Sequence, residues 1–270
     1  MAEALYQPFP IPGDARGHIW HHVPATRRPR HFHAEPELNL ITAGRATFGY
    51  GEATVSVSAG DALWWPPGQD HVLLEATPDL DLYVVGVTPA FSDLVLGDPV
   101  FKASGVARLH LGQDALAGLR AACAVQRAGG EAATVERHVG DFWREAFRTR
   151  AGRRDHHPLT VRALGSLLGR PDLQRGELAR LIRGNASEVS RYFHRDLGLT
   201  LVAYRTRLRL IRFIQLVESG RRSFLAAAIE AGFGSYSQCH RAFQRAFTCT
   251  PRVFFGTGVS EEMKERLAPL

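Results

Sequence analysis

The sequence predicts a β + α protein of two domains: an N-terminal β-barrel with accessory helices, then an all-α domain with two helix-turn-helix units. Three observations predict this division. Short apolar runs between glycines and prolines occupy the first part, helical periodicity begins near Asp114, and a helical pattern after Leu173 occurs twice. We place the barrel at residues 1–105, a helical dimerisation or linker region at 106–152, and the C-terminal domain at 153–258.

The composition narrows the class of protein. Of the 270 residues 45% are hydrophobic, so the chain can bury a sizeable core and is not globally disordered. Its apolar runs are too short to cross a bilayer, and the first residues lack the basic start of a secretory signal. Cys123, Cys239 and Cys249 are too widely spaced for a disulfide framework or a CxxC zinc site. We therefore expect reduced thiols, a cytoplasmic location and no membrane partner.

The predicted barrel is built from short runs rich in valine, leucine and aromatic residues. Glycines and prolines separate these runs at nearly regular intervals, which is typical of a barrel or a sandwich. The runs lie at 38–41, 46–50, 54–57, 62–65, 72–75 and 82–87.

Two amphipathic helices are predicted after the barrel. Each has one apolar face, and such helices would pack on the barrel or on a second subunit. A polar stretch at 152–158 that ends in Pro158 would link them to the C-terminal domain. The apolar faces consist of Leu116, Leu119, Ala122 and Cys123 in the first helix, and of Val135, Val139, Phe142, Trp143 and Phe147 in the second.

Positive charge is concentrated in the C-terminal part. From Arg153 onward there are 20 basic and 10 acidic residues, whereas the first 152 residues hold 13 basic and 17 acidic ones. Nearly all the basic residues are arginines, since Lys102 and Lys264 are the only lysines. A basic domain favours a polyanion as partner, although a solvated helical surface can carry the same charge.

The first helix-turn-helix unit is predicted at 173–198. A turn at 184–186 precedes a helix that Ser187 can cap and Gly198 ends. The inward stripe of that helix is Val189, Phe193 and Leu197.

The second unit, at 224–247, repeats the first at an offset of 50 residues. A turn at 232–234 precedes a helix that Ser235 or Ser237 can cap. In this register Arg241 takes the place of Arg191. The inward stripe is Cys239, Phe243 and Phe247.

The two units together predict double-stranded DNA as the partner. A recognition helix fits the major groove, where an outward arginine can bond O6 and N7 of a guanine. The long helix predicted at 202–219 would hold two such helices about one DNA turn, roughly 34 Å, apart. Its arginines are expected to face phosphates; they are Arg205, Arg207, Arg209 and Arg212.

Residues 173–255 resemble the DNA-binding domain of AraC-type regulators. The resemblance rests on the blocks ARLIRGNASEVSRYFHRDLGLTLVAYRTRLRL and AAIEAGFGSYSQCHRAFQRAFTCTPRVF, most specifically on the ending from Phe243 to Pro251. The sequence departs from the family at Cys239, where a large apolar residue is usual, and at Cys249, often a glycine. The resemblance implies seven helices and a set of base-reading residues. These are Ser187, Ser190, Arg191, Ser237, Gln238 and Arg241.

Histidines in the predicted barrel form a second constellation. His31 and His33 lie on one face of a strand because side chains alternate, and Glu37 and His71 can join them at the same mouth. The spacing from His31 to Gly44, and from Gly60 through the Pro-Pro-Gly at 66–68 to His71, resembles the two motifs of cupin barrels. Three imidazoles and one carboxylate suit Zn, Fe, Mn, Ni or Cu, so the resemblance implies a metal site at His31, His33, Glu37 and His71.

Several alternatives remain open for the barrel. Sensor barrels of AraC-type regulators often keep a HxH pair and a glutamate for an organic effector without metal. His18, His21 and His22 belong either to an arm over the barrel or to its surface. One of Trp64 and Trp65 should face the cavity and the other outward, by the two-residue period of a strand.

These inferences predict a cytoplasmic transcription regulator, not an enzyme, that binds DNA as a homodimer and senses a small molecule or metal ion. The effector would shift the population of arm or helix positions and so change how paired DNA-binding domains sit on half-sites. The alternative function is a metal-dependent cupin enzyme, a dioxygenase or isomerase, whose helices serve assembly.

Overall fold

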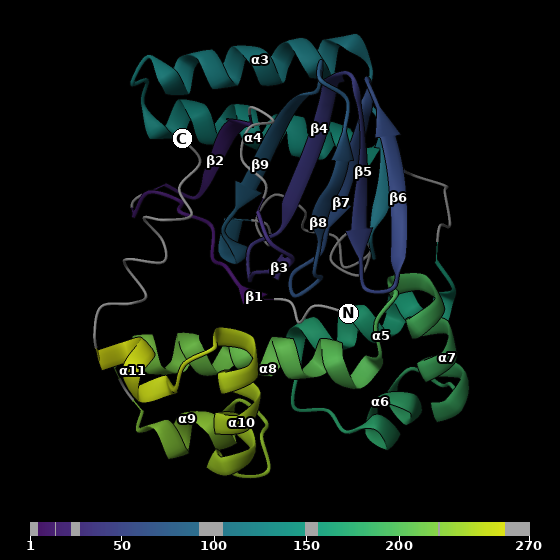
Figure 1. Cartoon of the computed structure of the whole chain (residues 1–270), viewed down its shortest axis with the longest axis vertical. Helices are drawn as coiled ribbons and strands as arrows, with labels where there is room; N and C mark the ends of the chain where they lie inside the picture. The colour runs from purple at the N-terminus through teal and green to yellow at the C-terminus, as the bar shows by residue number, and fades with distance from the viewer. Residues whose placement is uncertain are drawn as a thin grey trace.

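A computed structural model describes residues 5–13, 15–22, 28–91, 105–148, 156–220 and 222–256. Figure 1 shows three layers along the long axis: a helical hairpin, a β-barrel, and a helical C-terminal domain. The predicted fold class is therefore confirmed. Among the described helices, none is both long and apolar enough to span a membrane.

The barrel consists of two antiparallel sheets and a short parallel pair. Its strands are β1 (Leu5–Tyr6), β2 (Gly17–His22), β3 (His31–Phe32), β4 (Glu37–Ala43), β5 (Arg45–Tyr50), β6 (Ala53–Ser58), β7 (Asp61–Trp65), β8 (Val72–Ala76), β9 (Asp81–Val87) and β10 (Ala107–His110). The larger sheet has the order β10-β7-β4-β9-β2, and the smaller one has the order β6-β5-β8. β1 pairs in parallel with β3.

The barrel extends past the boundary that the sequence predicts. β10 pairs with β7, with Ala107 opposite Trp64, so the region at 106–152 is not wholly helical and the barrel continues to His110. The missed strand is only four residues long and lies directly before a clear helical pattern. That shortness explains why its period of two does not stand out.

Alternation along the strands gives the larger sheet two buried faces. Leu38 and Leu40 on β4 pack beneath the helical hairpin together with Trp64 of β7. The neighbouring Trp65 packs inward, against Phe48 of the smaller sheet. The ambiguity between the two tryptophans is thus resolved, with Trp65 facing the barrel interior.

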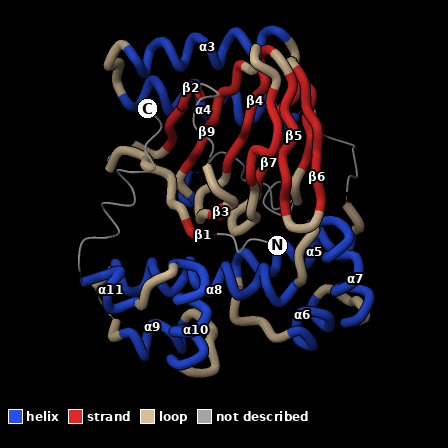
Figure 2. Tube along the Cα trace, in the orientation of Figure 1, coloured by secondary structure: helices blue, strands red, loops and turns tan. Residues whose placement is uncertain are grey.

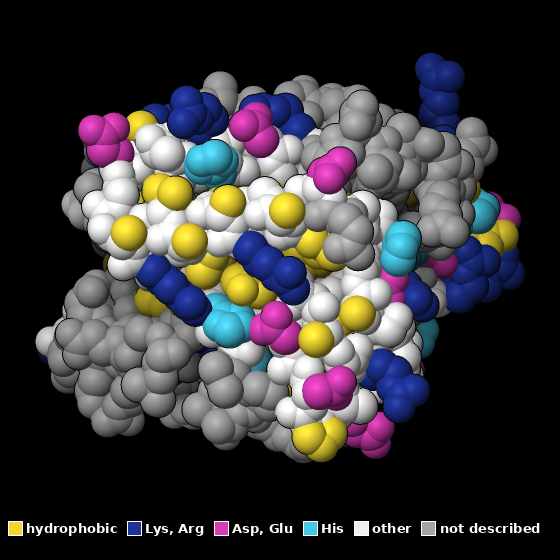
Figure 3. Space-filling view, turned by 90° about the horizontal axis from the view of Figure 1, so that it is seen from above, with side chains coloured by type: hydrophobic (Ala, Val, Ile, Leu, Met, Phe, Trp, Pro, Cys, Tyr) yellow, Lys and Arg dark blue, Asp and Glu magenta, His cyan; other side chains and the backbone are white. Residues whose placement is uncertain are grey.

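Two helices, α3 (Gln113–Arg127) and α4 (Ala132–Arg148), cover the outer face of the larger sheet (Figure 2). Their predicted apolar faces are buried against it, except that the side chains of Trp143 and Phe147 lie outside the described residues. The view from above in Figure 3 shows hydrophobic side chains among basic and acidic ones over this layer. Exposed alanines of α3 and of its C-terminal end are Ala117, Ala121, Ala124 and Ala128.

The C-terminal domain has seven helices within the described residues, as the resemblance implies. They are α5 (Pro158–Gly169), α6 (Arg175–Leu181), α7 (Ala186–Leu197), α8 (Leu201–Glu218), α9 (Phe224–Glu230), α10 (Tyr236–Phe247) and α11 (Pro251–Gly256). In Figure 1, α8 runs beneath the barrel, with α5 to α7 at one end and α9 to α11 at the other. The hydrophobic core of this domain also takes in Tyr6 and Phe32 from β1 and β3.

Candidate metal centre and nucleic-acid interface

Three histidines meet inside the barrel. His31 lies on β3, His33 follows that strand, and His71 directly precedes β8, where it bridges back to His31. One nitrogen from each histidine lies within 4.8 Å of the others. Glu37, the first residue of β4, places Oε2 at 2.8 Å from Nε2 of His33 and at 3.0 Å from Nε2 of His71. The structure thus brings together all four residues that the sequence predicts.

Backbone carbonyls orient the three rings. Nδ1 of His31 donates to the carbonyl of Pro29 at 2.8 Å, and Nδ1 of His33 donates to that of Glu35 at 2.7 Å. Nδ1 of His71 faces the carbonyl of Gln69 at 3.4 Å. Because a carbonyl can only accept, Nδ1 of His31 and of His33 carries a proton, and Nε2 of His33 and of His71 points at the Glu37 carboxylate. Carbonyl contacts of this kind orient metal-ligating histidines in proteins.

A chain of polar contacts holds Glu37. Nδ2 of Asn39 donates to Oε1 of Glu37, and Oδ1 of Asn39 accepts from the indole of Trp65 at 2.8 Å. The Trp65 ring also stacks on His71, with centroids 4.7 Å apart and planes at 12°. Trp65 therefore helps to position two of the four residues, Glu37 through Asn39 and His71 by stacking.

The electrostatics of the site favour a charged carboxylate at Glu37. Burial raises the pKa of Glu37, but His71 and His33 outweigh it and hold that pKa well below its usual value. Burial, then His71 and His33, hold the pKa of His31 well below its usual value. Nitrogens of His33 and His71 thus converge on one carboxylate oxygen, and a cation can take the place of a proton between them. The donor set fits a divalent transition metal.

The histidines open into a small cavity of about 60 Å³. This volume is large enough to hold water or a small ion. The walls are otherwise largely apolar, but they include His22 and Arg28, and burial lowers the pKa of each of these two groups. The apolar lining consists of Phe9, Trp20, Phe48, Leu73, Leu82 and Val84.

The upstream histidines do not form an arm over the barrel. They lie on β2, which pairs along its whole length with β9. His21 bonds the carboxylate of Asp81, His18 contacts Gln126 of α3, and His22 lines the cavity. The sequence did not single out His22, Arg28 or Asn39 as residues of the cavity. The alternation of Glu37 and Asn39 along β4 was the available signal for the last of them.

The two recognition helices, α7 and α10, are equivalent in their ends as well as in their faces. Each has 12 residues, and the offset of 50 residues relates their N-caps, Asn185 and Ser235. The predicted cap Ser187 is wrong, because the side chain of Asn185 accepts from the amides of Ser187 and Glu188. Of the two candidates in the second unit, Ser235 is the cap.

The base-reading residues that the resemblance implies all lie on these helices. Ser187, Arg191, Ser237, Gln238 and Arg241 are exposed. Ser190 is half-buried, and its hydroxyl donates to the carbonyl of Ala186. The side-chain oxygen Oε1 of Gln238 accepts from the backbone amide of Gly234 in the preceding turn at 2.9 Å. Their contacts with DNA stay a prediction.

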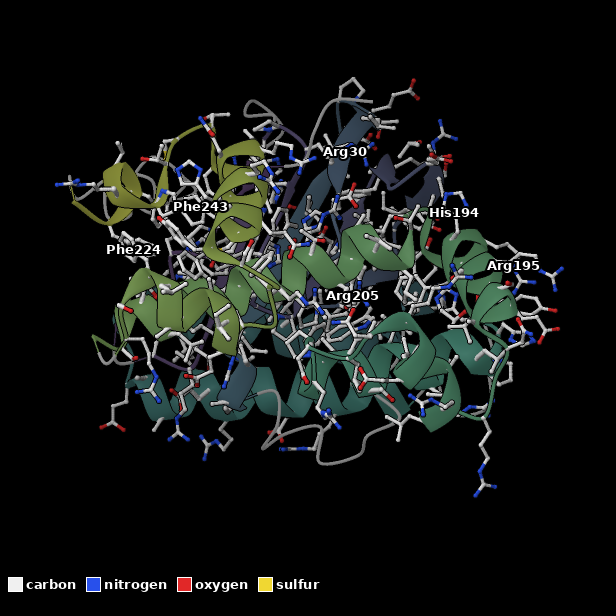
Figure 4. The ribbon with its side chains drawn as sticks, turned by 90° about the horizontal axis from the view of Figure 1, so that it is seen from below. Arg30, His194, Arg195, Arg205, Phe224 and Phe243 are labelled. Atoms are coloured by element: carbon white, nitrogen blue, oxygen red, sulfur yellow. The ribbon has the colours of Figure 1, made fainter. Side chains whose placement is uncertain are left out.

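Three of the four arginines of α8 are engaged by the protein itself, whereas Arg212 is exposed and its contact with phosphate stays a prediction. Arg205 donates to the carbonyl of Leu173, and the buried Arg209 donates to those of Pro171 and Asp172. Arg212 lies 3.8 Å from Glu230, and Arg207 reaches the barrel. These side chains fix helices and domains to one another. Figure 4 shows Arg205 in the first half of α8, together with Arg30 of the barrel and His194 on α7.

A loop of the barrel, residues 66–71, makes the main polar contact between the domains. Asp70 is buried and bonds Arg207 of α8 and Arg30 of the barrel, each at 2.6 Å. Burial raises the pKa of Asp70, but Arg207 and Arg30 outweigh it and hold the pKa below its usual value. The hydroxyl of Tyr204 on α8 donates to the carbonyl of Pro67 at 2.7 Å. This loop ends at His71, so it belongs to both the metal centre and the domain contact.

Family comparisons identify both domains. Residues 178–256 match the model of a helix-turn-helix domain, and residues 14–140 match that of the AraC-like ligand binding domain. The chain belongs to the AraC-type transcription regulators. It is thus a DNA-binding regulator of transcription with a ligand-binding barrel. No curated protein sequence matches this regulator.

Solved structures similar to this regulator share little sequence with it. ToxT from Vibrio cholerae is 11% identical, with a TM-score of 0.48, and the match covers 90% of this chain and 99% of ToxT. The AraC-like transcriptional activator CuxR is 13% identical, with a TM-score of 0.35, covering 74% of this chain and 72% of CuxR. A cupin 2 conserved barrel domain protein from Salinispora arenicola is 28% identical, with a TM-score of 0.25, covering 29% of this chain and 66% of that protein.

Proposed function

We propose that this regulator responds to a metal ion, which the barrel binds through His31, His33, Glu37 and His71. The observation that carries the proposal is the convergence of imidazole nitrogens on one carboxylate oxygen, with every Nδ1 turned toward a carbonyl. An apolar organic effector would add no counter-charge to that buried carboxylate. A divalent cation compensates it.

The size of the cavity supports a metal over a large organic effector. Pockets for drug-sized ligands have volumes of roughly 300–1,000 Å³, whereas the described walls enclose about 60 Å³. Solved ToxT structures hold an unsaturated fatty acid or a naphthalenyl-substituted butenoic acid. A ligand of that size would require the cavity of this chain to enlarge. The space beside the four ligands suits water or a small anion, which His22 and Arg28 would attract.

Metal occupancy would change how α7 and α10 are presented to DNA. The metal binds the folded site better than the unfolded or rearranged one, so it shifts the population toward the arrangement in which the ligands converge. We propose a homodimer as the DNA-bound form, in which that shift alters the fit of paired domains to half-sites.

The test is metal content together with DNA binding. Protein purified without an affinity tag should hold about one transition-metal ion per chain by elemental analysis, and His71→Ala should lose it. His110→Ala is the matched control, because His110 lies on β10 outside the cavity and contacts Asp61. In gel-shift titrations, removing the metal should change the affinity of the wild-type protein for a selected DNA duplex but not that of His71→Ala.

Two other results would contradict the proposal in different ways. Protein that takes up no metal at any added concentration would leave the four residues as a pocket for an organic effector. Metal that binds stoichiometrically without any effect on DNA binding would favour the metal-dependent cupin enzyme.

A further inference from the structure

We propose that Arg207, on α8 of the DNA-binding domain, is a positioning residue of the barrel's metal centre. This inference rests on the proposed metal site. One side chain of the second domain contacts the immediate neighbours, along the chain, of all three histidine ligands. The DNA-binding domain therefore completes the sensor site.

The first contact acts on His71. Nη1 of Arg207 donates to Oδ1 of Asp70 at 2.6 Å, and Asp70 is the residue directly before His71. The other oxygen, Oδ2, accepts from Arg30 at 2.6 Å and from the backbone of Gly51 at 3.0 Å. The side chain of Asp70 is only 2% exposed, so these bonds are its compensation for burial. Moving Arg207 would therefore displace Asp70 or leave its charge under-compensated.

The second contact acts on the segment 31–33, which holds the other two histidines. The guanidinium of Arg207 lies over the ring of Phe32, 5.1 Å from its centroid. Phe32 lies between His31 and His33, and alternation directs it away from the cavity that these histidines enter. The segments that hold His31 and His71 are also joined directly. The backbone amide of each residue donates to the carbonyl of the other, at 3.1 and 2.9 Å.

The geometry makes the ligands sensitive to small displacements of α8. Further bonds tie the same loop to the C-terminal domain: Nη1 of Arg207 reaches the carbonyl of Gly68 at 3.4 Å, and Gln69 donates to the carbonyl of Leu197 at 3.3 Å. A binding constellation works only within about 0.5 Å of its productive geometry. Because coupling between two ligands is reciprocal, DNA that repositions α8 must change metal affinity by the same factor by which metal changes DNA affinity.

The test compares Arg207→Gln with Arg205→Gln in the full-length protein, with Co(II) as the probe. Arg205 lies on the same helix, but it donates to a carbonyl within its own domain, so it controls for general damage to α8. Arg207→Gln should weaken Co(II) binding by about 10- to 100-fold, as loss of groups that orient metal ligands typically does. It should also change the visible absorption spectrum of the bound Co(II). Arg207→Lys should restore part of the affinity, and Arg205→Gln should match the wild type in both readouts.

A second measurement separates positioning from mere stability. A DNA duplex selected by the wild-type protein from random sequences should change Co(II) affinity by the same factor in the wild type and in Arg205→Gln. In Arg207→Gln the same DNA should leave the Co(II) affinity nearly unchanged. If Arg207→Gln does not fold, Asp70→Asn takes its place, because it keeps the shape of the side chain and removes the charge that Arg207 meets.

The outcomes distinguish this inference from the proposed function. A folded Arg207→Gln protein with wild-type Co(II) affinity and spectrum would overturn the inference and leave the metal site standing. The same holds for Asp70→Asn if it is the variant that folds. A wild-type protein that binds no Co(II) would overturn the proposed function, and this inference with it.

Discussion

Arg191 and Arg241 occupy equivalent, exposed places on the two recognition helices. Arg191 lies over the ring of its neighbour Tyr192, 4.9 Å from the centroid, and this contact restricts the guanidinium before DNA is bound. A side chain held in place loses less entropy on binding. The two arginines are therefore the residues whose loss should be felt most directly in sequence recognition.

Replacing either arginine by alanine should cost about 1–3 kcal/mol of discrimination between the preferred duplex and one altered at the contacted base pair. Competition gel shifts measure this, with Arg137→Ala on α4 as a control far from the recognition helices. Equal loss of affinity for both duplexes would mean that the arginine contacts phosphate instead of a base.

The residues that end the two recognition helices differ although their backbone does not. Gly198 ends α7 at φ 66° and Thr248 ends α10 at φ 56°, both in the left-handed region. A β-branched residue such as Thr248 is strained in this region. At Gly198 the packing of the barrel against the helix end also requires glycine. A Cβ on Gly198 would lie 2.8 Å from the backbone of Tyr50 and Glu52 in the barrel, so the barrel excludes a side chain at this position.

Thr248→Gly should therefore stabilise the protein by about 1 kcal/mol, since it relieves the left-handed strain. Gly198→Ala should destabilise it by more than that, because it adds a clash with the barrel to the strain. Urea unfolding followed by circular dichroism measures both. Destabilisation by Thr248→Gly would show that the hydroxyl's contact with the carbonyl of Phe247 outweighs the backbone strain.

At the scale of elements, the local signals in the sequence were enough for most of the barrel. The predicted runs at 38–87 coincide with β4 to β9, because alternation and glycine-containing turns are local properties. β2 was missed because three histidines interrupt its apolar pattern, and β3 because it has only two residues. The twofold helix-turn-helix pattern was readable because each turn carries a glycine and each helix a stripe at 3.6-residue spacing.

The sequence was enough to predict the four candidate ligands of the metal centre, but not the neighbouring residues that hold them in place. His31, His33, Glu37 and His71 follow from their spacing, whereas the role of Trp65 depends on register. It lies opposite Glu37 because β4 and β7 are antiparallel with that pair in line. Contacts between the domains could not be predicted from the sequence, because residues such as Tyr204 and Pro67 are 137 residues apart and no local pattern links them. For the same reason the contacts of Arg205, Arg207 and Arg209 with groups of the protein could not be foreseen.

At the scale of the whole molecule, the two domains share one hydrophobic cluster. Tyr6 of β1 packs on Phe32 and on Phe247 of α10, with centroids 5.6 and 5.1 Å apart. Glu52 in the β5–β6 turn donates its amide to the carbonyl of Gly198 at 2.7 Å. Together with the buried Asp70 contacts, these interactions should make the domains unfold as one cooperative unit.

The buried thiols provide a measurement of that cooperativity. Burial raises the pKa of Cys239, in the C-terminal domain, to about 12, and it also raises the pKa of Cys123 on α3. Only the thiolate reacts, so both should resist iodoacetamide at pH 8 until the protein unfolds. With rising urea, mass spectrometry should show both cysteines becoming labelled at the same midpoint. Labelling of Cys239 at clearly lower urea would show that the C-terminal domain unfolds alone.

One substitution should uncouple the two midpoints. A Cβ on Gly51 would lie 2.1 Å from the carbonyl oxygen of Gly198, so Gly51→Ala forces the domains apart at this point. Gly129→Ala is the matched control, because Gly129 also has a positive φ of 71° but a Cβ added there would meet no atom within 4 Å. The control should lower both midpoints slightly and keep them together.

The two-residue strand β3 has a consequence for how such regulators can be recombined. His31 of β3 and His33 directly after it supply ligands to the barrel, whereas Phe32 between them belongs to the core of the other domain. A chimeric protein that joins this barrel to foreign DNA-binding helices would therefore lose the cation over Phe32 and one of the two counter-charges of Asp70. A working exchange of DNA-binding domains would have to keep α8 with the barrel. The functional boundary between effector sensing and DNA recognition therefore lies inside the C-terminal domain.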